Sequence, residues 1–500
     1  MSCGKFMQEN RLKDFVCSRG RHYTTLPLRK TAARLPLLIA AMLVTGCAVG
    51  PDYRSPDLSM PKSWSEQPAD KAVIAPVSIT QWWKAFNDPT LDSLVAQAVE
   101  SNHDLRIAEA RVREARALHR VAASDLWPAI NTSGAYSRSR RSIGNTAIPQ
   151  AAPVERNLFQ TGFDASWEVD VFGGNRRATE AAKADVDAAV ESRRDAQITL
   201  LAEVARNYIE LRGLQRRMEI FLSSVQMQED AVAIIKAKYK SGLISELDAV
   251  QAESLLASTK AQIPALENTI KQTIHRISVL LGKNPGDLTS CLLPKKPIPI
   301  STSEIPPGLP SDLLRRRPDV RYAERTLAAA TARIGVAKAD LFPRFSLTGN
   351  FGLQAEELRV IPMTGISRYW SFGPTIRWPI FSAGRIRANI RAQGERQTQA
   401  LLTYEKTVLL ALEDVENALV ACETEQARRR NLCDAVAAGK RAVELATELY
   451  IKGMTGFLNV LDARRSLLQT EDELALSERT VSQNLVFLYK AIGGGWEAGG

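Results

Sequence analysis

The chain has 500 residues and a formal net charge of +10, from 65 Lys and Arg against 55 Asp and Glu. Residues 1–46 hold eight Lys or Arg and two Asp or Glu, a net +6, which leaves +4 for the rest and does not indicate a nucleic-acid partner. Beyond residue 47 three cysteines remain (Cys291, Cys422 and Cys433), too few for a disulfide framework.

The first 46 residues have the pattern of a targeting segment. Basic residues precede an apolar run over residues 35–44, which is too short to span a bilayer as a helix. The run ends in Val-Thr-Gly-Cys47, which resembles the lipobox of bacterial lipoproteins. This resemblance implies cleavage before Cys47, lipidation of Cys47 and, with Ala48 next, sorting to the outer membrane; an ordinary signal peptide is the alternative. We expect a signal peptide at 1–46 and a lipidated extended segment at 47–88.

The first half of the remaining chain contains one very long helical pattern. Apolar residues recur at helical spacing over about 90–126, 175–240 and 244–282. At 1.5 Å per residue the middle helix would be about 100 Å long, a length typical of coiled coils and elongated bundles. Pro264 should bend the helix that contains it.

The second half repeats this order, with helices expected over about 312–341, 385–452 and 456–491. Residues 125–128 (Asp-Leu-Trp-Pro) return at 340–343 (Asp-Leu-Phe-Pro), and Tyr239-Lys-Ser-Gly242 returns as Tyr450-Ile-Lys-Gly453. A repeat this long indicates a duplicated half-molecule rather than a solenoid. In each half the two shorter helices together match the long one in length and should lie end to end beside it. The expected divisions are a first repeat over 89–286, a linker over 287–310, a second repeat over 311–495 and a tail over 496–500.

Two arginine runs lie in these helical patterns, at residues 315–317 and 428–430. They have no aromatic residues between them and no nucleic-acid-binding motif around them, so we interpret them as solvated helix surface.

Four segments change to an alternation of apolar and polar residues, over about 129–140, 159–171, 345–354 and 370–380. A half-buried antiparallel sheet would show this alternation. Strands of about ten residues with one apolar face, one charged face and aromatic residues near the ends also describe a transmembrane β-barrel. The lipoprotein signal favours the barrel. Pro374, in the middle of the last strand, should mark a bulge or the end of regular pairing.

Four strands cannot close a membrane barrel, because the smallest ones need about eight. An open sheet edge is not tolerated in lipid, so the chain must associate with copies of itself. Two copies would give eight strands and a barrel filled with side chains, whereas three would give twelve and an aqueous lumen. The connections at about 141–156 and 356–367 would then face outside the cell, and the helices would lie in the periplasm.

Several motifs occur in a fixed order along the chain. Residues 313–321 read Leu-Leu-Arg-Arg-Arg-Pro-Asp-Val-Arg, and Ala-Arg-Ile-Gly at 332–335 leads to Phe-Pro-Arg-Phe-Ser-Leu-Thr-Gly at 342–349. Cys-Ala-Val-Gly-Pro-Asp-Tyr at 47–53 and Trp-Pro-Ile-Phe at 378–381 complete the set. From residue 47 to about 493 the chain resembles the TolC-like outer membrane efflux lipoproteins, the NodT and OprM type that serves resistance-nodulation-division pumps.

The resemblance implies a mainly α-helical fold with a membrane β-barrel. A homotrimer of duplicated protomers would form a 12-strand barrel and a periplasmic α-helical tunnel. It implies a passive exit duct, lipid-anchored in the outer membrane. An inner-membrane resistance-nodulation-division transporter would deliver drugs and toxic compounds to it through a periplasmic adaptor. Its partners would be outer membrane lipid and these proteins, without nucleic acid, metal or cofactor.

The resemblance also assigns roles to the two helix–turn–helix tips. A second-tip constriction ring with two acidic positions maps to Asn459 and Asp462, so only Asp462 keeps the carboxylate. Asp248 lies at the equivalent place in the first tip. Alternatively, these two aspartates only cap or decorate a helix near its start.

Adaptor docking maps to Gly242, Leu243, Gly453 and Met454. For the two glycines there is also a local reason, since a helix reversal needs a residue that tolerates a positive φ.

Other functions fit the sequence less well. The catalytic motifs HExxH, GxSxG and the Walker loop are absent, and His103, His119 and His275 have no metal-ligand spacing, so we do not expect an enzyme. A structural coiled-coil lipoprotein explains the helices but not the strands, and a general porin explains the strands but not the helices. The same fold could also serve type I protein secretion or major-facilitator-type export.

Overall fold

The computed structural model describes residues 48–65, 79–140, 155–301 and 310–496. The predicted signal peptide, Cys47 and most of the 141–156 connection lie outside these residues. Residues from Ala48 onward belong to one compact unit, and the account below concerns that unit alone.

The duplication predicted from the sequence is visible in the helix lengths. Helices α4 (Gly174–Lys240) and α10 (Arg385–Ile451) both have 67 residues. Helices α5 (Glu246–Leu280) and α11 (Phe457–Ala491) both have 35, and α3 (His103–Ser124) and α8 (Pro318–Ala339) both have 22. Each half therefore has one long helix and two shorter ones of matched length.

The other helices in the described part of the chain are shorter. They are η1 (Ile79–Phe86), α2 (Pro89–Ser101), α6 (Thr289–Leu292), η3 (Pro310–Asp312), α7 (Leu313–Arg316), η4 (Leu358–Val360) and α9 (Thr364–Ser367).

Two helices that we expected to be continuous are divided. The 90–126 pattern splits into α2 and α3 at Asn102, whose side chain accepts from Leu105 N and donates to the carbonyl of Leu280. The 312–341 pattern splits before Pro318, which occupies the first position of α8, where its missing N–H costs nothing. Helix α5 continues through Pro264, and its bend stays a prediction.

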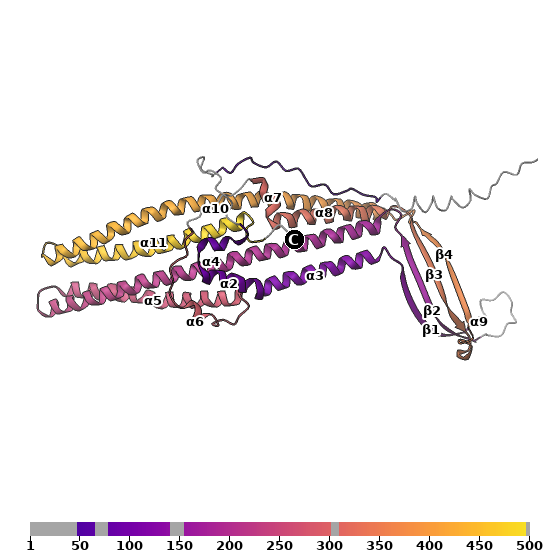
Figure 1. The fold of residues 1–500 in the computed structure, drawn as a ribbon, viewed down its shortest axis with the longest axis horizontal. Coiled ribbons are helices and arrows are strands. Elements are labelled where there is room, and N and C mark those ends of the chain that lie inside the picture. Colours follow the sequence, from indigo (N-terminus) through magenta and orange to yellow (C-terminus); the bar gives the residue numbers. More distant parts are fainter. Residues whose placement is uncertain (1–47, 66–78, 141–154, 302–309, 497–500) are drawn as a thin grey trace, which may run out of the picture. The chain divides into compact units, whose positions relative to one another are not determined.

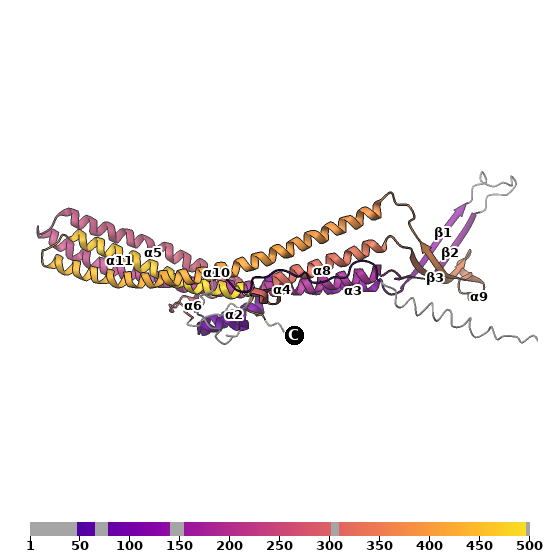
Figure 2. The same cartoon turned by 90° about the horizontal axis from the view of Figure 1, so that it is seen from above.

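The shorter helices lie end to end beside the long ones, as predicted. Figures 1 and 2 both show α3 beside the early part of α4 and α5 beside its later part, with α8 and α11 arranged in the same way along α10. Contacts of α4 with α8 and α11 join the two halves. The largest hydrophobic core lies where these helices meet and includes the fully buried Tyr208 and Tyr489.

The four strands form one antiparallel sheet in chain order, β1 (Ala129–Arg140), β2 (Glu155–Val169), β3 (Arg344–Ala355) and β4 (Arg368–Arg377). Within this sheet β1 and β4 are the edges. The predicted bulge or break at Pro374 is wrong, because Pro374 pairs with Leu347 in an unbroken register. The reason is its position on an edge strand, where proline is tolerated.

The register assigns every side chain to a face, since directly paired residues point to the same side. One face is apolar and exposed, and it holds Ile130, Tyr136, Phe163, Leu347, Phe351, Trp370, Phe372 and Ile376. The other face is polar, and it holds Asn131, Asp164, Asn350, Ser371, Glu168, Ser346 and Thr375. On that face the Asn131 amide donates to Asp164 at 3.1 Å. No helix of the described residues covers either face of the sheet as a layer.

Candidate functional site

The two helix-reversal tips have the same backbone geometry. Gly242 ends the α4 side and Gly453 ends the α10 side, both with a φ of +73°. In each tip the residue after the glycine donates its N–H to the carbonyl five positions earlier, from Leu243 to Lys238 O at 3.0 Å and from Met454 to Leu449 O at 2.9 Å. This is the Schellman motif, which requires the left-handed conformation that glycine adopts without steric cost. The predicted positive φ at both glycines is confirmed.

The tips present apolar side chains to the surroundings and pack on a small core of their own. Leu243 is 73% exposed and Met454 is 72% exposed. Beneath them a separate cluster joins the two hairpins, with Phe457 against the Tyr450 ring at 5.3 Å and Lys238 Nζ 4.6 Å from the same ring. The exposed leucine and methionine are therefore held at the ends of two mutually supported hairpins.

The proposed second-tip gate residues lie one turn apart near the start of α11. Asp462 is exposed and pairs with Arg465 at 2.9 Å on the same helix. Asn459 is exposed and donates its amide to the hydroxyl of Thr455. Sequence reasoning missed Arg465, although its spacing of three residues from Asp462 is the usual signal for such a pair. The carboxylate of Asp462 thus has a cation beside it.

Asp248 has a local structural function. It forms a capping box with Ser245, whose hydroxyl donates to Asp248 at 2.8 Å, while the Asp248 N–H donates back to that hydroxyl. Within the described residues its hydrogen bonds stay inside the first tip, so they do not link it to Asn459 or Asp462.

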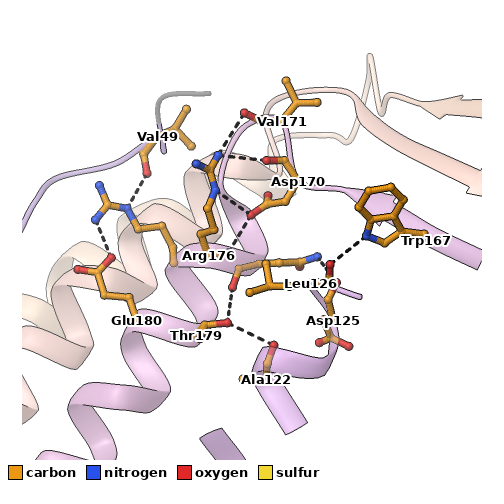
Figure 3. Close-up of polar contacts among 12 residues, drawn as sticks. Val49, Ala122, Asp125, Leu126, Trp167, Asp170, Val171, Arg176, Thr179 and Glu180 are labelled. Atoms are coloured by element: carbon orange, nitrogen blue, oxygen red, sulfur yellow. Dashed lines mark hydrogen bonds and ion pairs between the residues drawn. The ribbon is translucent and has the colours of Figure 1, made fainter. Parts of the chain in front are cut away.

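The junction between sheet and helices is fixed by hydrogen bonds from both sides. Figure 3 shows Trp167, on β2, donating its indole N–H to the carbonyl of Leu126 just after α3. Asp170 accepts from the Arg176 backbone at 2.8 Å, and Thr179 donates to the carbonyl of Ala122. Since α3, β2 and α4 all contribute, the strands leave the helices in a defined direction.

The segment that follows Cys47 is bound along helices of both halves. Arg177 of α4 pairs with Asp52 at 2.6 Å and donates to the carbonyl of Val49 at 3.2 Å. Tyr53 donates its hydroxyl to Glu324 of α8 at 3.0 Å. The start of this segment therefore lies beside the start of α4: Ala48 is next to Gly173, and Val49 donates its N–H to the carbonyl of Phe172, just after β2.

The prediction of solvated surface for the 315–317 run is wrong for one of its arginines. Arg317 is not solvated surface, because only 12% of its side chain is exposed. It pairs with Asp319 at 2.6 Å and Asp414 at 3.0 Å, and it donates to the carbonyl of Ala491. These partners lie on α8, α10 and α11, so Arg317 links three helices.

A cavity of about 180 Å³ adjoins Arg317, with Asp195, Asp319, Asp414 and Lys490 in its lining. Burial, and next the negative charge of Asp319, raise the pKa of the Asp195 carboxyl above its ordinary value. The positive charges of Lys490 and Arg317 lower this pKa, but by less than burial and Asp319 raise it.

None of the helices that the structure describes is long and apolar enough to cross a membrane.

Comparison with known proteins gives a consistent family. The family model described as outer membrane efflux protein matches residues 94–283 and again 309–494, once in each half. Nodulation protein T of Rhizobium leguminosarum bv. trifolii is 33% identical over 464 residues, which cover 91% of this chain and 96% of that protein. The solvent efflux pump outer membrane protein SrpC of Pseudomonas putida is 34% identical over 466 residues, covering 92% and 97%.

The solved structure of the outer-membrane channel OprN matches with a TM-score of 0.84 at 38% identity, over 90% of this chain and 100% of that one. The TolC-like fold predicted from the sequence is confirmed. The chain belongs to the outer membrane efflux protein family and is a channel of the outer membrane, not an enzyme.

Proposed function

We propose that three copies of this chain form a lipid-anchored exit duct in the outer membrane. The observation that carries the proposal is the two-faced sheet with two open edges. Its apolar face is exposed, its polar face carries Asp164 and Glu168, and its edge strands β1 and β4 lack a second neighbour within the described chain. Only closure removes such edges in lipid, and twelve strands leave a water-filled lumen.

The flanking helices support association of copies. Helix α3 exposes Ile107, Leu118 and Val121, and α10 exposes Leu402 and Leu409, between 49% and 67% for each side chain. Apolar rows of this kind on long helices indicate contact with another helix. Because α3 and α10 lead into and out of the edge strands, the same neighbour that pairs with β1 or β4 would cover them.

The duct is proposed to work as the outer part of a tripartite pump. The relatives include proteins named for solvent, toluene and antibiotic efflux pumps. Small apolar or amphipathic compounds are therefore the proposed cargo, delivered by an inner-membrane resistance-nodulation-division transporter. A periplasmic adaptor would contact the tips through Gly242, Leu243, Gly453 and Met454. Cys47 would carry the lipid.

The narrow end of the duct is proposed to lie at the tips. Asp462 supplies one carboxylate per copy, and Asn459 contributes a neutral amide where the family has an acid. Asp248 would lie at the equivalent place of the first tip. Because Arg465 offsets the charge of Asp462, this ring should attract divalent cations only weakly.

The decisive experiment combines mass and conductance of the purified, lipidated protein. A trimer in detergent that conducts ions in planar bilayers is the expected result. A monomer or dimer without conductance would overturn the proposal and favour a structural lipoprotein.

A further inference from the structure

The apolar face of the sheet ends in arginines at the outer ends of both edge strands. On β1, this face holds Ile130, Thr132, Gly134, Tyr136, Arg138 and Arg140, in that order toward the 141–154 connection. On β4, Arg368 is the first residue, and the register places it on the same face as Trp370 and Phe372. The arginines are therefore on the side that would face lipid, not on the polar side.

These arginines carry more positive charge than their neighbours neutralise. Arg138 and Arg140 share one carboxylate, Glu155, at 2.5 Å and 3.7 Å. Both arginine side chains remain 65% exposed. Arg368 forms no ion pair with any other residue that the structure describes. Three guanidinium groups against one carboxylate leave a net charge of +2 on this face of each protomer.

Aromatic rings lie directly next to the arginines on the same face. Tyr136 contacts Phe159 with ring centroids 4.7 Å apart, and Trp370 stacks on Phe372 at 5.3 Å. Aromatic girdles of membrane barrels lie at the level of the lipid head groups. Residues one or two positions beyond such a girdle, as Arg138 and Arg368 are, reach the phosphate level of the outer leaflet.

Closure of the barrel brings the two edge strands together. If β4 of one copy pairs with β1 of the next, the Arg368 end of one protomer meets the Arg138 and Arg140 end of its neighbour. This step depends on the trimer proposed above. Each of the three seams would then present three arginines next to a strip of aromatic and aliphatic surface.

We infer that each seam binds a phosphate-bearing glycolipid of the outer leaflet. Arginine suits phosphate because its planar group donates two parallel hydrogen bonds and stays charged at every physiological pH. The acyl chains would lie on the aromatic strip below. A lipid bound across the seam would hold two protomers together in addition to the proposed pairing of β4 with β1.

The opposite face provides a matched control. Arg156 and Arg377 lie on the polar face of β2 and β4 by the same register, and Arg156 pairs with Glu356 at 2.6 Å. Replacing Arg156 and Arg377 by Gln removes the same number of positive charges from the same sheet, but from the side that would line the lumen.

The test is native mass spectrometry of the purified full-length protein in detergent, titrated with lipid A and with the same lipid after removal of its phosphates. The wild-type trimer should bind the phosphorylated form, up to three per trimer, at least about tenfold more tightly than the dephosphorylated form. The double variant Arg138→Gln/Arg368→Gln should lose that preference, and Arg156→Gln/Arg377→Gln should keep it.

Equal binding of the two lipids by the wild-type trimer would overturn the inference without affecting the proposed duct. So would an equal loss in both double variants, which would indicate a general charge effect. A protein that is not trimeric in the same spectra would overturn both proposals, because no seam would exist. Since the wild-type comparison alone measures phosphate dependence, the result does not depend on the assembly of the variants.

Discussion

Trp378 donates its indole N–H to the carbonyl oxygen of Leu341 at 3.0 Å, on the chain segment that follows α8. The equivalent bond in the first half joins Trp167 to Leu126, also at 3.0 Å. Each bond ties a residue at the base of the sheet to the end of the helix that precedes the neighbouring strand. The duplicated chain thus fixes its sheet to its helices twice by the same contact.

Trp167→Phe and Trp378→Phe should each lower stability by about 1 kcal/mol, because an aromatic ring is kept but the indole N–H and its hydrogen bond are lost. The melting temperature of the assembled protein measures the effect. Trp127→Phe is the control, since Trp127 is 73% exposed. An equal decrease in the control would show that the bonds are not the cause.

Gly453→Ala and Gly242→Ala should loosen the tips by about 1 kcal/mol each, because both glycines have φ of +73° and alanine is strained there. Nothing within 4 Å would obstruct the added methyl group, so the strain lies in the backbone alone. Hydrogen–deuterium exchange of the tip amides should accelerate. Gly394→Ala, inside α10 with equally open space, should slow local exchange instead. The same sign at all three positions would contradict this account.

Asp462→Ala should raise single-channel conductance and weaken block by divalent cations if Asp462 lies at the constriction. Arg465→Ala should strengthen that block, because it removes the cation 2.9 Å from the carboxylate. Planar-bilayer recordings measure both. Glu267→Ala, an exposed carboxylate on α5, is the control. If Asp462→Ala changed neither the conductance nor the block, Asp462 would be a surface residue of α11 and not part of the constriction.

Arg317→Ala should destabilise the protein by about 1–3 kcal/mol, since it removes the largely buried cation bonded to the partly exposed Asp319 and Asp414. Arg316→Ala should cost less than about 1 kcal/mol, because that side chain is 42% exposed and its pair with Asp312 is 3.9 Å long. Chemical unfolding compares the two, with Arg317→Lys as an intermediate case. Similar losses for both alanine variants would favour the surface interpretation.

Asp195→Asn should stabilise the protein at neutral pH. Burial and Asp319 raise the pKa of Asp195 in the folded state, so the folded chain binds this proton more tightly than the unfolded chain does. Stability from this group is complete below its ordinary pKa and is lost as the pH rises through the raised pKa. The gain in melting temperature should therefore be larger at pH 7.5 than at pH 4. Asp187→Asn, whose side chain is 40% exposed, should show no such difference.

Periodicity in the sequence predicted the long elements closely. The helix expected at 175–240 spans 174–240, and the one expected at 385–452 spans 385–451. Many turns of consistent pattern define such elements, so one unusual residue changes little. The sequence pattern did not predict the breaks between α2 and α3 and between α7 and α8. Asn102 caps α3 locally through Leu105 N, but its second bond, to the carbonyl of Leu280 178 positions away, is one that no local pattern contains.

The candidate site shows the same limit. Glycine at a helix reversal predicts a positive φ from local sterics, and both tips have it. The burial of Arg317 depends instead on Asp414 and Ala491, which a reading of neighbouring residues does not bring together. The roles of Asp462 and Asn459 depend on copies of the chain, and they stay predictions.

The equal lengths of α4 and α10 restrict how this protein can change over time. Deleting one residue from either helix would retract its tip by about 1.5 Å and rotate every later side chain by about 100°. The apolar residues of the shortened helix would then no longer face the helices packed against it. Its tip would also end about one helical residue short of the other tip. Length changes are thus expected in the connections, whereas the two long helices are expected to diverge by substitution.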